Sequence, residues 1–254
     1  MSTQIAVNGA AGRMGRTVIE TAAERDDLEV VVGFDVADES EVLGVPVVDA
    51  GDVGDALAEY EPAVVVDFTV PESTVALADA CAEAGVGLVI GTTGFDEDGF
   101  AAIDAASESV PVLKATNFSR GIQALLRSVR EAVGALDGYD LELMETHHNQ
   151  KIDAPSGTAK TILETVQDQR DVEPVYGREG HAPRDEDEIG VFARRAGDIR
   201  GEHELVLAGN DEVVSLSHRA EDRAVFAAGA LDAAAWLAGR EAGRYEFGSV
   251  VDET

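Results

Sequence analysis

The 254-residue sequence has one cysteine, three lysines and no long hydrophobic run. The single cysteine, Cys81, excludes an intrachain disulfide and favours a reducing compartment. No apolar stretch approaches the ~20 residues that span a bilayer, and the N-terminus leads into a strand pattern without a basic segment or an apolar signal core. These absences predict a cytoplasmic protein that does not interact with a membrane.

Positive charge is scarce along the whole chain. Nineteen Lys and Arg residues stand against fifty Asp and Glu residues, for a formal net charge of −31. This charge repels phosphate backbones and anionic lipids, so we expect no nucleic-acid partner. The acidic residues are spread along the sequence, which predicts a salt-adapted surface, because the Debye length of ~3 Å near 1 M salt screens self-repulsion.

Strands and helices alternate in the first half of the chain. Short Val-rich runs at 5–7, 30–34, 64–68, 88–90 and 112–113 are separated by helical or turn-like sequence. Pro71 and Ser119 are typical of positions where helices begin. This alternation predicts an α/β protein with a Rossmann-type, doubly wound parallel sheet.

The pattern changes after about residue 120. A helix at 122–136 precedes strands at 141–144, 189–195, 204–207 and 213–217, and a further helix begins at Gly157. Several strands in succession predict a smaller α+β domain with a mixed sheet. The helical stretch 224–239 has no strands of its own, so we expect it to return to the first domain. The predicted domains are residues 1–119 with 224–254, and residues 120–223.

The first candidate site is a glycine-rich turn, Gly9-Ala10-Ala11-Gly12-Arg13-Met14-Gly15, between a strand and a helix. Backbone N–H groups and the helix dipole at such a turn hold a pyrophosphate. Asp35 ends the second strand, where an acid binds the ribose of a dinucleotide. Together they predict a dinucleotide site, against the alternative of a plain glycine-rich turn. Asp35 favours NADH, whereas Arg13 or Arg16 could hold the 2′-phosphate of NADPH.

A second turn, Gly91-Thr92-Thr93-Gly94, follows the strand at 88–90. It lies at the carboxyl edge of the predicted sheet, where ligands bind in open α/β folds. A simple strand-ending turn explains the same residues, so both interpretations stay open here.

The densest polar cluster runs from residue 145 to 159 and contains His147, His148 and Lys151. Adjacent histidines also occur in metal sites, but no cysteine and no second histidine pair follows, so we expect no metal. A solvated loop without a function is the other alternative. Gly157 and Thr158 begin a helix after Pro155, so their N–H groups and the Thr158 hydroxyl form a carboxylate clamp. Lys151 and His148 could neutralise a second carboxylate.

This cluster resembles the signature of the dihydrodipicolinate reductase family. The matching residues are Glu145, His147, His148, Lys151 and the run 153–159. The similarity extends to residues 9–16, 91–95, 117–119, 178–181, 195–198 and 201–203, and so covers essentially the whole chain.

The resemblance implies an NADH- or NADPH-dependent reductase of a cyclic imine dicarboxylate, acting in the diaminopimelate route to lysine. It implies that His147 is the general acid and that Lys151 is the cation held against the substrate. His148, Thr93, Gly157 and Thr158 match positions that bind the substrate carboxylates. The matching cofactor positions are Gly9, Gly12, Arg13, Met14, Asp35, Phe68, Gly91, Thr93, Ala115, Asn117 and Phe118. The resemblance also implies a homotetramer that pairs through the sheets of its substrate domains.

Two rival interpretations share the predicted cofactor half. One is a dehydrogenase of another small amino-acid precursor, which the signature from Lys151 to Ala159 argues against. The other is a regulatory module that binds NAD(H) without turnover, because a fold alone does not establish activity. The chain departs from some family members at Asn149-Gln150 and at Val36. The second departure bears on the choice between NADH and NADPH.

Overall fold

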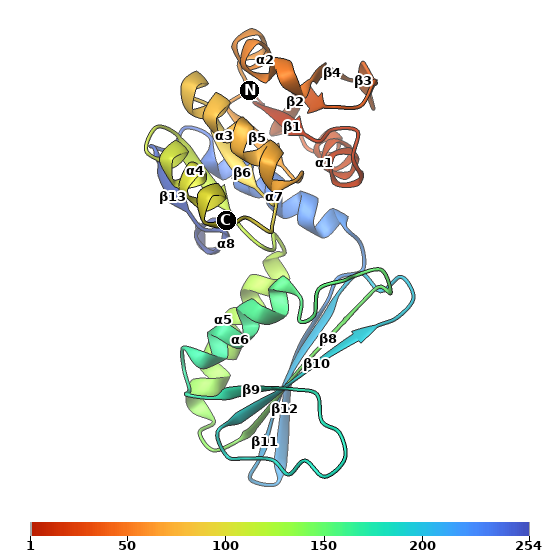
Figure 1. The fold of residues 1–254 in the computed structure, drawn as a ribbon. Helices are drawn as coiled ribbons and strands as arrows, with labels where there is room; N and C mark the ends of the chain where they lie inside the picture. The colour runs from red at the N-terminus through yellow and green to blue at the C-terminus, as the bar shows by residue number, and fades with distance from the viewer. Residues whose placement is uncertain (1, 254) are drawn as a thin grey trace. The chain divides into compact units, whose positions relative to one another are not determined.

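The computed structural model describes residues 2–253, which form two compact units (Figure 1). Unit 1 holds the residues through Phe118 together with those from Arg223 onward, and unit 2 is Ser119–Asp222. Among the described residues, no helix is both long enough and apolar enough to cross a bilayer.

Unit 1 is built on an eight-stranded sheet in the order β13-β7-β6-β5-β1-β2-β4-β3. All its strand pairs are parallel except that of β3 with β4. Its strands are β1 (Thr3–Asn8), β2 (Leu28–Asp35), β3 (Glu41–Val42), β4 (Val45–Asp49), β5 (Val64–Asp67), β6 (Gly87–Ile90), β7 (Pro111–Lys114) and β13 (Gly243–Tyr245).

Helices cover both faces of this sheet because its central strands are apolar on both sides. On one face Val7 and Val66 pack with residues of α1 (Arg13–Ala23), α7 (Ala224–Leu237) and α8 (Phe247–Glu253). On the other face Ala6 and Val65 pack with residues of α2 (Val53–Tyr60), α3 (Pro71–Ala84) and α4 (Glu97–Ser107). The doubly wound sheet predicted from the sequence is confirmed.

Unit 2 is a five-stranded mixed sheet in the order β12-β11-β8-β10-β9. Its strands are β8 (Asp140–His147), β9 (Glu173–Tyr176), β10 (Glu188–Arg195), β11 (Glu202–Gly209) and β12 (Glu212–Arg219). Strands β8, β9 and β10 are parallel, whereas β11 and β12 run antiparallel to their neighbours. Helices α5 (Arg120–Ala135) and α6 (Gly157–Gln167) pack on apolar residues of this sheet in a single core. The predicted mixed sheet is confirmed.

Several short elements were not predicted. They are β3, β4, β9, β13, the short helix η1 (Ala50–Asp52), α2 and α8. Strands β3, β9 and β13 lie at sheet edges, where few apolar residues are needed and the period-2 pattern is weak. The strand predicted at 64–68 ends at Asp67, one residue early, because the chain leaves the sheet before Phe68.

Candidate active site

The glycine-rich turn of unit 1 has the close packing that a phosphate-binding turn requires. Gly9 has a φ of +74°, and a Cβ on Gly15 would lie 2.0 Å from the Gly9 carbonyl oxygen. Only glycine lets α1 begin so close to the end of β1. Gly12 caps α1 without a side-chain hydrogen bond, so no side chain at this cap covers the first-turn N–H groups of Arg13 and Met14. The turn therefore fits a dinucleotide pyrophosphate.

Asp35 lies at the end of β2, and backbone groups hold its carboxylate in place. Oδ2 accepts a hydrogen bond from the Ala11 N–H at 2.8 Å, and Oδ1 accepts one from the Ala37 N–H at 3.0 Å. Arg16 donates to both carboxylate oxygens of Glu39, at 2.9 and 2.7 Å. Val36 is 86% exposed. The surroundings of Asp35 therefore match a ribose diol better than a 2′-phosphate.

A buried carboxylate, Asp67, joins three of the loops at this edge of the sheet. Oδ1 accepts hydrogen bonds from Asn8 Nδ2 at 2.8 Å and Thr69 Oγ1 at 2.6 Å. Oδ2 accepts from Thr74 Oγ1 at 2.5 Å and Thr92 Oγ1 at 2.8 Å. The sequence analysis missed this role of Asp67. Its signal was the set of hydroxyl and amide residues at or just beyond the ends of β1, β5 and β6.

Phe68 and Gly91 fit against each other, because a Cβ on Gly91 would lie 2.1 Å from the Phe68 ring. The Phe68 ring also meets the Phe118 ring edge to face, with centroids 5.8 Å apart. Ala115 N–H donates to the carbonyl of Ile90 at 3.1 Å, which joins the loops after β6 and β7. All the cofactor positions named from the family resemblance lie in unit 1, at or beside the turns after β1, β2, β5, β6 and β7.

The predicted acid, His147, is the last residue of β8 and is held by a buried ion pair. Its Nδ1 lies 2.6 Å from Oε2 of Glu145, which is fully buried. Arg195 binds both Glu145 oxygens at 2.8 Å. Burial alone would raise the pKa of Glu145, but the hydrogen bonds and charges of His147 and Arg195 outweigh it and lower this pKa to about 2. The carboxylate therefore stays ionised.

Lys151 lies in the loop that follows β8. Its Nζ is 2.8 Å from Asp153 Oδ1, and its side chain is only partly exposed. Burial of Asp153 works against ionisation, but the hydrogen bond and charge of Lys151 outweigh it and lower the pKa of Asp153. His148 precedes this loop, and its carbonyl accepts a hydrogen bond from the Lys151 N–H at 3.2 Å.

The carboxylate clamp predicted from the sequence falls at the N-terminus of α6. Ser156 caps the helix, because its Oγ accepts a hydrogen bond from the Ala159 N–H at 3.2 Å. Gly157 is the first helical residue, and Thr158 is buried beside it. His148, Lys151, Gly157 and Thr158 all lie in unit 2, whereas Thr93, predicted for both ligands, lies in unit 1.

His203 on β11 is a second buried histidine of this site that the sequence analysis did not assign. Its Nε2 lies 3.1 Å from Ser156 Oγ, and its ring meets the His147 ring edge to face at 5.2 Å. Burial, together with the charge of His147, lowers the pKa of His203 to about 4. His203 is therefore neutral near pH 7. Strand pairing across unit 2 could not be inferred from local sequence, so this contact was missed.

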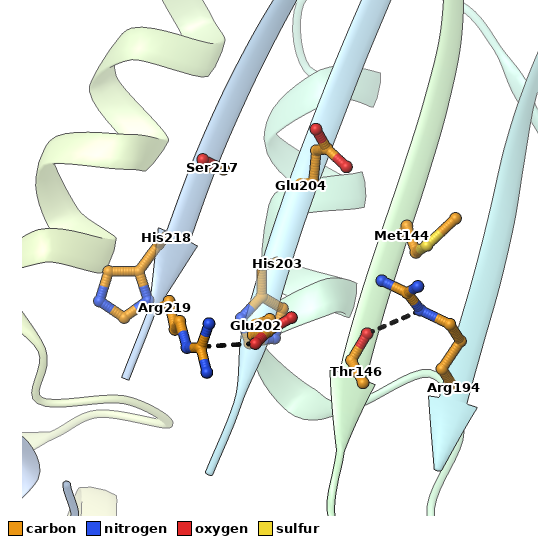
Figure 2. Close-up of a pocket in the computed structure, with 9 residues that line it drawn as sticks. All are labelled: Met144, Thr146, Arg194, Glu202, His203, Glu204, Ser217, His218 and Arg219. Carbon is orange, nitrogen blue, oxygen red and sulfur yellow. Dashed lines mark hydrogen bonds and ion pairs between the residues drawn. The ribbon is translucent and has the colours of Figure 1, made fainter. Parts of the chain in front are cut away.

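A pocket on the sheet of unit 2 is lined by residues of β8, β10, β11 and β12, among them His203 (Figure 2). Two arginines in the pocket have partners: Arg219 Nε lies 3.2 Å from Glu202 Oε1, and Arg194 donates a hydrogen bond to Thr146 Oγ1. Neither His147 nor Lys151 lines this pocket. Within residues 2–253, no group of three or more His, Cys, Asp or Glu side chains is arranged to hold a metal ion.

Comparison with known families decides the assignment. Residues 3–118 match the family described as dihydrodipicolinate reductase, N-terminus, and residues 121–251 match dihydrodipicolinate reductase, C-terminus. The chain belongs to the dihydrodipicolinate reductase family. As a member of this family it is an NAD(P)H-dependent reductase, which confirms the predicted enzyme class and cofactor class.

Relatives in this family match over nearly their full length. The 4-hydroxy-tetrahydrodipicolinate reductase of Haloarcula marismortui is 68% identical over 98% of this chain and 99% of its own. The enzyme of the same name from Natronomonas pharaonis is 54% identical over 97% of this chain and 99% of its own. A solved structure, dipicolinate-bound dihydrodipicolinate reductase from Paenisporosarcina sp. TG-14, shares the fold. Its TM-score is 0.80 at 23% identity, over 97% of this chain and 98% of that one.

Proposed function

We propose that this reductase converts 4-hydroxy-tetrahydrodipicolinate to tetrahydrodipicolinate in the diaminopimelate route to lysine, with His147 as the proton donor. The observation that carries the proposal is His147, hydrogen-bonded to the buried Glu145, on the same unit as Lys151 and the N-terminus of α6. These groups match a substrate with two carboxylates and a ring that must accept a proton. The relatives at 68% and 54% identity carry the name of this reaction.

The cofactor side of the proposal rests on unit 1. Gly9, Gly12, Arg13 and Met14 bind the pyrophosphate, and Asp35 binds the adenosine ribose. The nicotinamide end of the cofactor site is assigned to the residues after β5, β6 and β7, namely Phe68, Gly91, Thr93, Ala115, Asn117 and Phe118. When bound, the nicotinamide supplies the hydride that reduces the ring.

The proton comes from His147 in its imidazolium form. Nδ1–H donates to Glu145, so the transferred proton is the one on Nε2. Within the described residues, Nε2 has no hydrogen-bond partner. A Cβ on Gly201 would lie 3.1 Å from Nε2, so glycine at this position keeps space beside the donating atom. One hydride and one proton enter the ring and the 4-hydroxyl leaves as water, which balances the conversion, and His147 then regains a proton from solvent.

The two substrate carboxylates are bound by groups that are positively charged or donate hydrogen bonds. Gly157 and Thr158 offer backbone N–H groups at the start of α6, and the Thr158 hydroxyl adds a third donor. Lys151, His148 and Thr93 complete the set. The Lys151 cation acts at contact range, because the net charge of −31 repels an anionic substrate at longer distance.

The assembly and setting follow from the same assignment. We infer that unit 1 is the dinucleotide-binding domain and that unit 2 binds substrate and pairs with other copies in a homotetramer. We also infer a cytoplasmic, halophilic enzyme, because a charge of −31 is best tolerated at high ionic strength.

Competition with dipicolinate tests the substrate side of the proposal. This planar aromatic dicarboxylate offers the two carboxylates of the substrate without a ring that can be reduced. We expect it to inhibit turnover competitively, and Lys151→Ala to weaken that inhibition. If dipicolinate competed with the cofactor instead of the substrate, the assignment of the dicarboxylate site to unit 2 would be wrong.

A further inference from the structure

The two oxygens of Glu145 are completely occupied by donors. Oε2 faces His147 Nδ1 at 2.6 Å and Arg195 NH1 at 2.8 Å. Oε1 faces Arg195 NH2 at 2.8 Å and the Ser156 N–H at 3.1 Å. A fully buried carboxylate is unfavourable unless it is paired and hydrogen-bonded, and here every partner is a donor.

Strand pairing places Arg195 beside this carboxylate. Arg195 on β10 is the register partner of His147 on β8. The Arg195 guanidinium also donates to two backbone carbonyls of the loop after β8, those of Lys151 and Asp153. One ion pair therefore touches His147, the segment that carries Lys151, and the residue that caps α6.

We propose that Glu145 and Arg195 are positioning residues of the substrate site: Glu145 sets the orientation and tautomer of His147, and Arg195 fixes the Lys151 loop to the same carboxylate. The inference rests on the proposed function, because it assigns His147 and Lys151 their catalytic and binding roles. Neither Glu145 nor Arg195 has to touch the substrate for this role.

The chemistry requires a carboxylate at position 145. In Glu145→Gln, the amide nitrogen would face a donor whichever way the amide is turned, because all four partners donate. The variant also removes the negative charge that stabilises the imidazolium form of His147. The other charged or titratable groups beside His147 are Arg195 on β10 and His203 on β11, and the charge of Lys151 in the loop after β8 reaches His203.

A double-mutant cycle separates positioning from simple structural support. We expect Glu145→Gln to lower kcat roughly 10²-fold, with the alkaline limb of the kcat profile moved to lower pH. In a His147→Gln background the same change should have almost no further effect on kcat, because Glu145 acts through His147. Glu131→Gln, an exposed position on α5, is the matched control and should leave kcat unchanged. Multiplicative effects of the two changes would overturn the role given to Glu145.

Arg195→Lys tests the other half of the pair. Lysine keeps the charge but loses the bidentate geometry, so we expect KM for the dicarboxylate to rise roughly 10-fold with a smaller change in kcat. The exposed Arg130→Lys on α5 is the control. An unchanged KM in Arg195→Lys would contradict the proposed link to the Lys151 loop.

Nitrogen-15 NMR of the histidine rings needs no turnover and so separates this inference from the proposed function. In the wild type at a pH where His147 is neutral, we expect its proton on Nδ1, and in Glu145→Gln a mixture of tautomers. A wild type with the proton on Nε2 would overturn the inference even if the enzyme were active. A wild type that shows the Nδ1 tautomer but does not reduce the cyclic dicarboxylate would instead refute the proposed function. If Glu145→Gln did not fold, the wild-type spectrum and Arg195→Lys would still decide.

Discussion

His147 Nδ1 lies 2.6 Å from Glu145 Oε2, so the proton available for transfer is on the other ring nitrogen. We therefore expect His147→Gln to lower kcat about 10²- to 10⁴-fold, the usual contribution of a positioned general acid. KM for the dicarboxylate should change little. Steady-state kinetics provide the measurement, with the exposed His181→Gln as the control. Full kcat in His147→Gln would mean that water or another group donates the proton.

Lys151 should affect binding as well as turnover. Its ammonium group acts on the substrate in both the ground state and the transition state, so we expect Lys151→Ala to raise KM and lower kcat. The combined loss in kcat/KM should be roughly 10- to 100-fold, in keeping with about 1.5–3 kcal/mol for a hydrogen bond to a charged group. Kinetics with varied dicarboxylate provide the measurement. A loss confined to kcat would place Lys151 in the chemical step alone.

Cofactor preference should depend on the residues around Asp35. Val36 is 86% exposed and Arg16 is paired with Glu39, so we expect NADH to bind more tightly than NADPH. Val36→Arg should tighten NADPH binding roughly 10-fold, because an arginine forms charge-assisted hydrogen bonds to the 2′-phosphate. Equilibrium titration followed by nicotinamide fluorescence measures both dissociation constants. The same gain in Val213→Arg, at an exposed position of unit 2, would indicate a general charge effect.

His203 makes stability depend on pH. Its pKa is about 4 in the folded state against an ordinary value near 6.5, so the folded state binds fewer protons between these values. The free energy of unfolding should therefore fall as pH drops from 6.5 towards 4, by roughly 3 kcal/mol from this group. The stabilisation from ionised Glu145 is lost only below its ordinary value, 4.5, down towards pH 2.

Between pH 6.5 and 4.5, the pH dependence of the free energy of unfolding therefore reports the contribution of histidine without that of Glu145. Urea unfolding in concentrated salt should show a shallower pH slope for His203→Asn than for the wild type. His181→Asn removes an exposed histidine and should keep the wild-type slope. Equal slopes in all three proteins would show that His203 titrates normally in the fold.

Salt should stabilise the protein over a wide range. With a net charge of −31, self-repulsion weakens the fold until ions screen it. We expect the thermal midpoint to rise steadily from dilute buffer to ~1 M KCl, where the Debye length is ~3 Å. Differential scanning calorimetry provides the measurement. A midpoint that was independent of KCl would remove the basis for a halophilic enzyme.

Much of the site could be predicted because its signals are local. The turn from Gly9 to Gly15, the acid at Asp35 and the helix start at Ser156 each combine residue types whose backbone roles are visible in a short window. The central strands of unit 1 are buried on both faces, so their Val-rich runs were also clear.

The missed features depend on contacts between distant segments. Arg195 meets Glu145 fifty positions away, and His203 meets Ser156 at a separation of forty-seven, through strand register that no local pattern specifies. No role was predicted for Asp67, because two of its donors, Asn8 and Thr92, come from distant parts of the chain. Edge strands such as β13 were missed because a short, half-exposed segment has little periodicity.

The most direct test is substrate-dependent oxidation of NADH and NADPH by the purified protein in high salt. The cyclic dicarboxylate is formed in the cuvette by enzymatic condensation of pyruvate with aspartate semialdehyde, and loss of the reduced nicotinamide is followed by absorbance. The account predicts oxidation only when all components are present, and a large loss in His147→Gln. Bound cofactor with no substrate-dependent oxidation would contradict it and favour a module that binds NAD(H) without turnover.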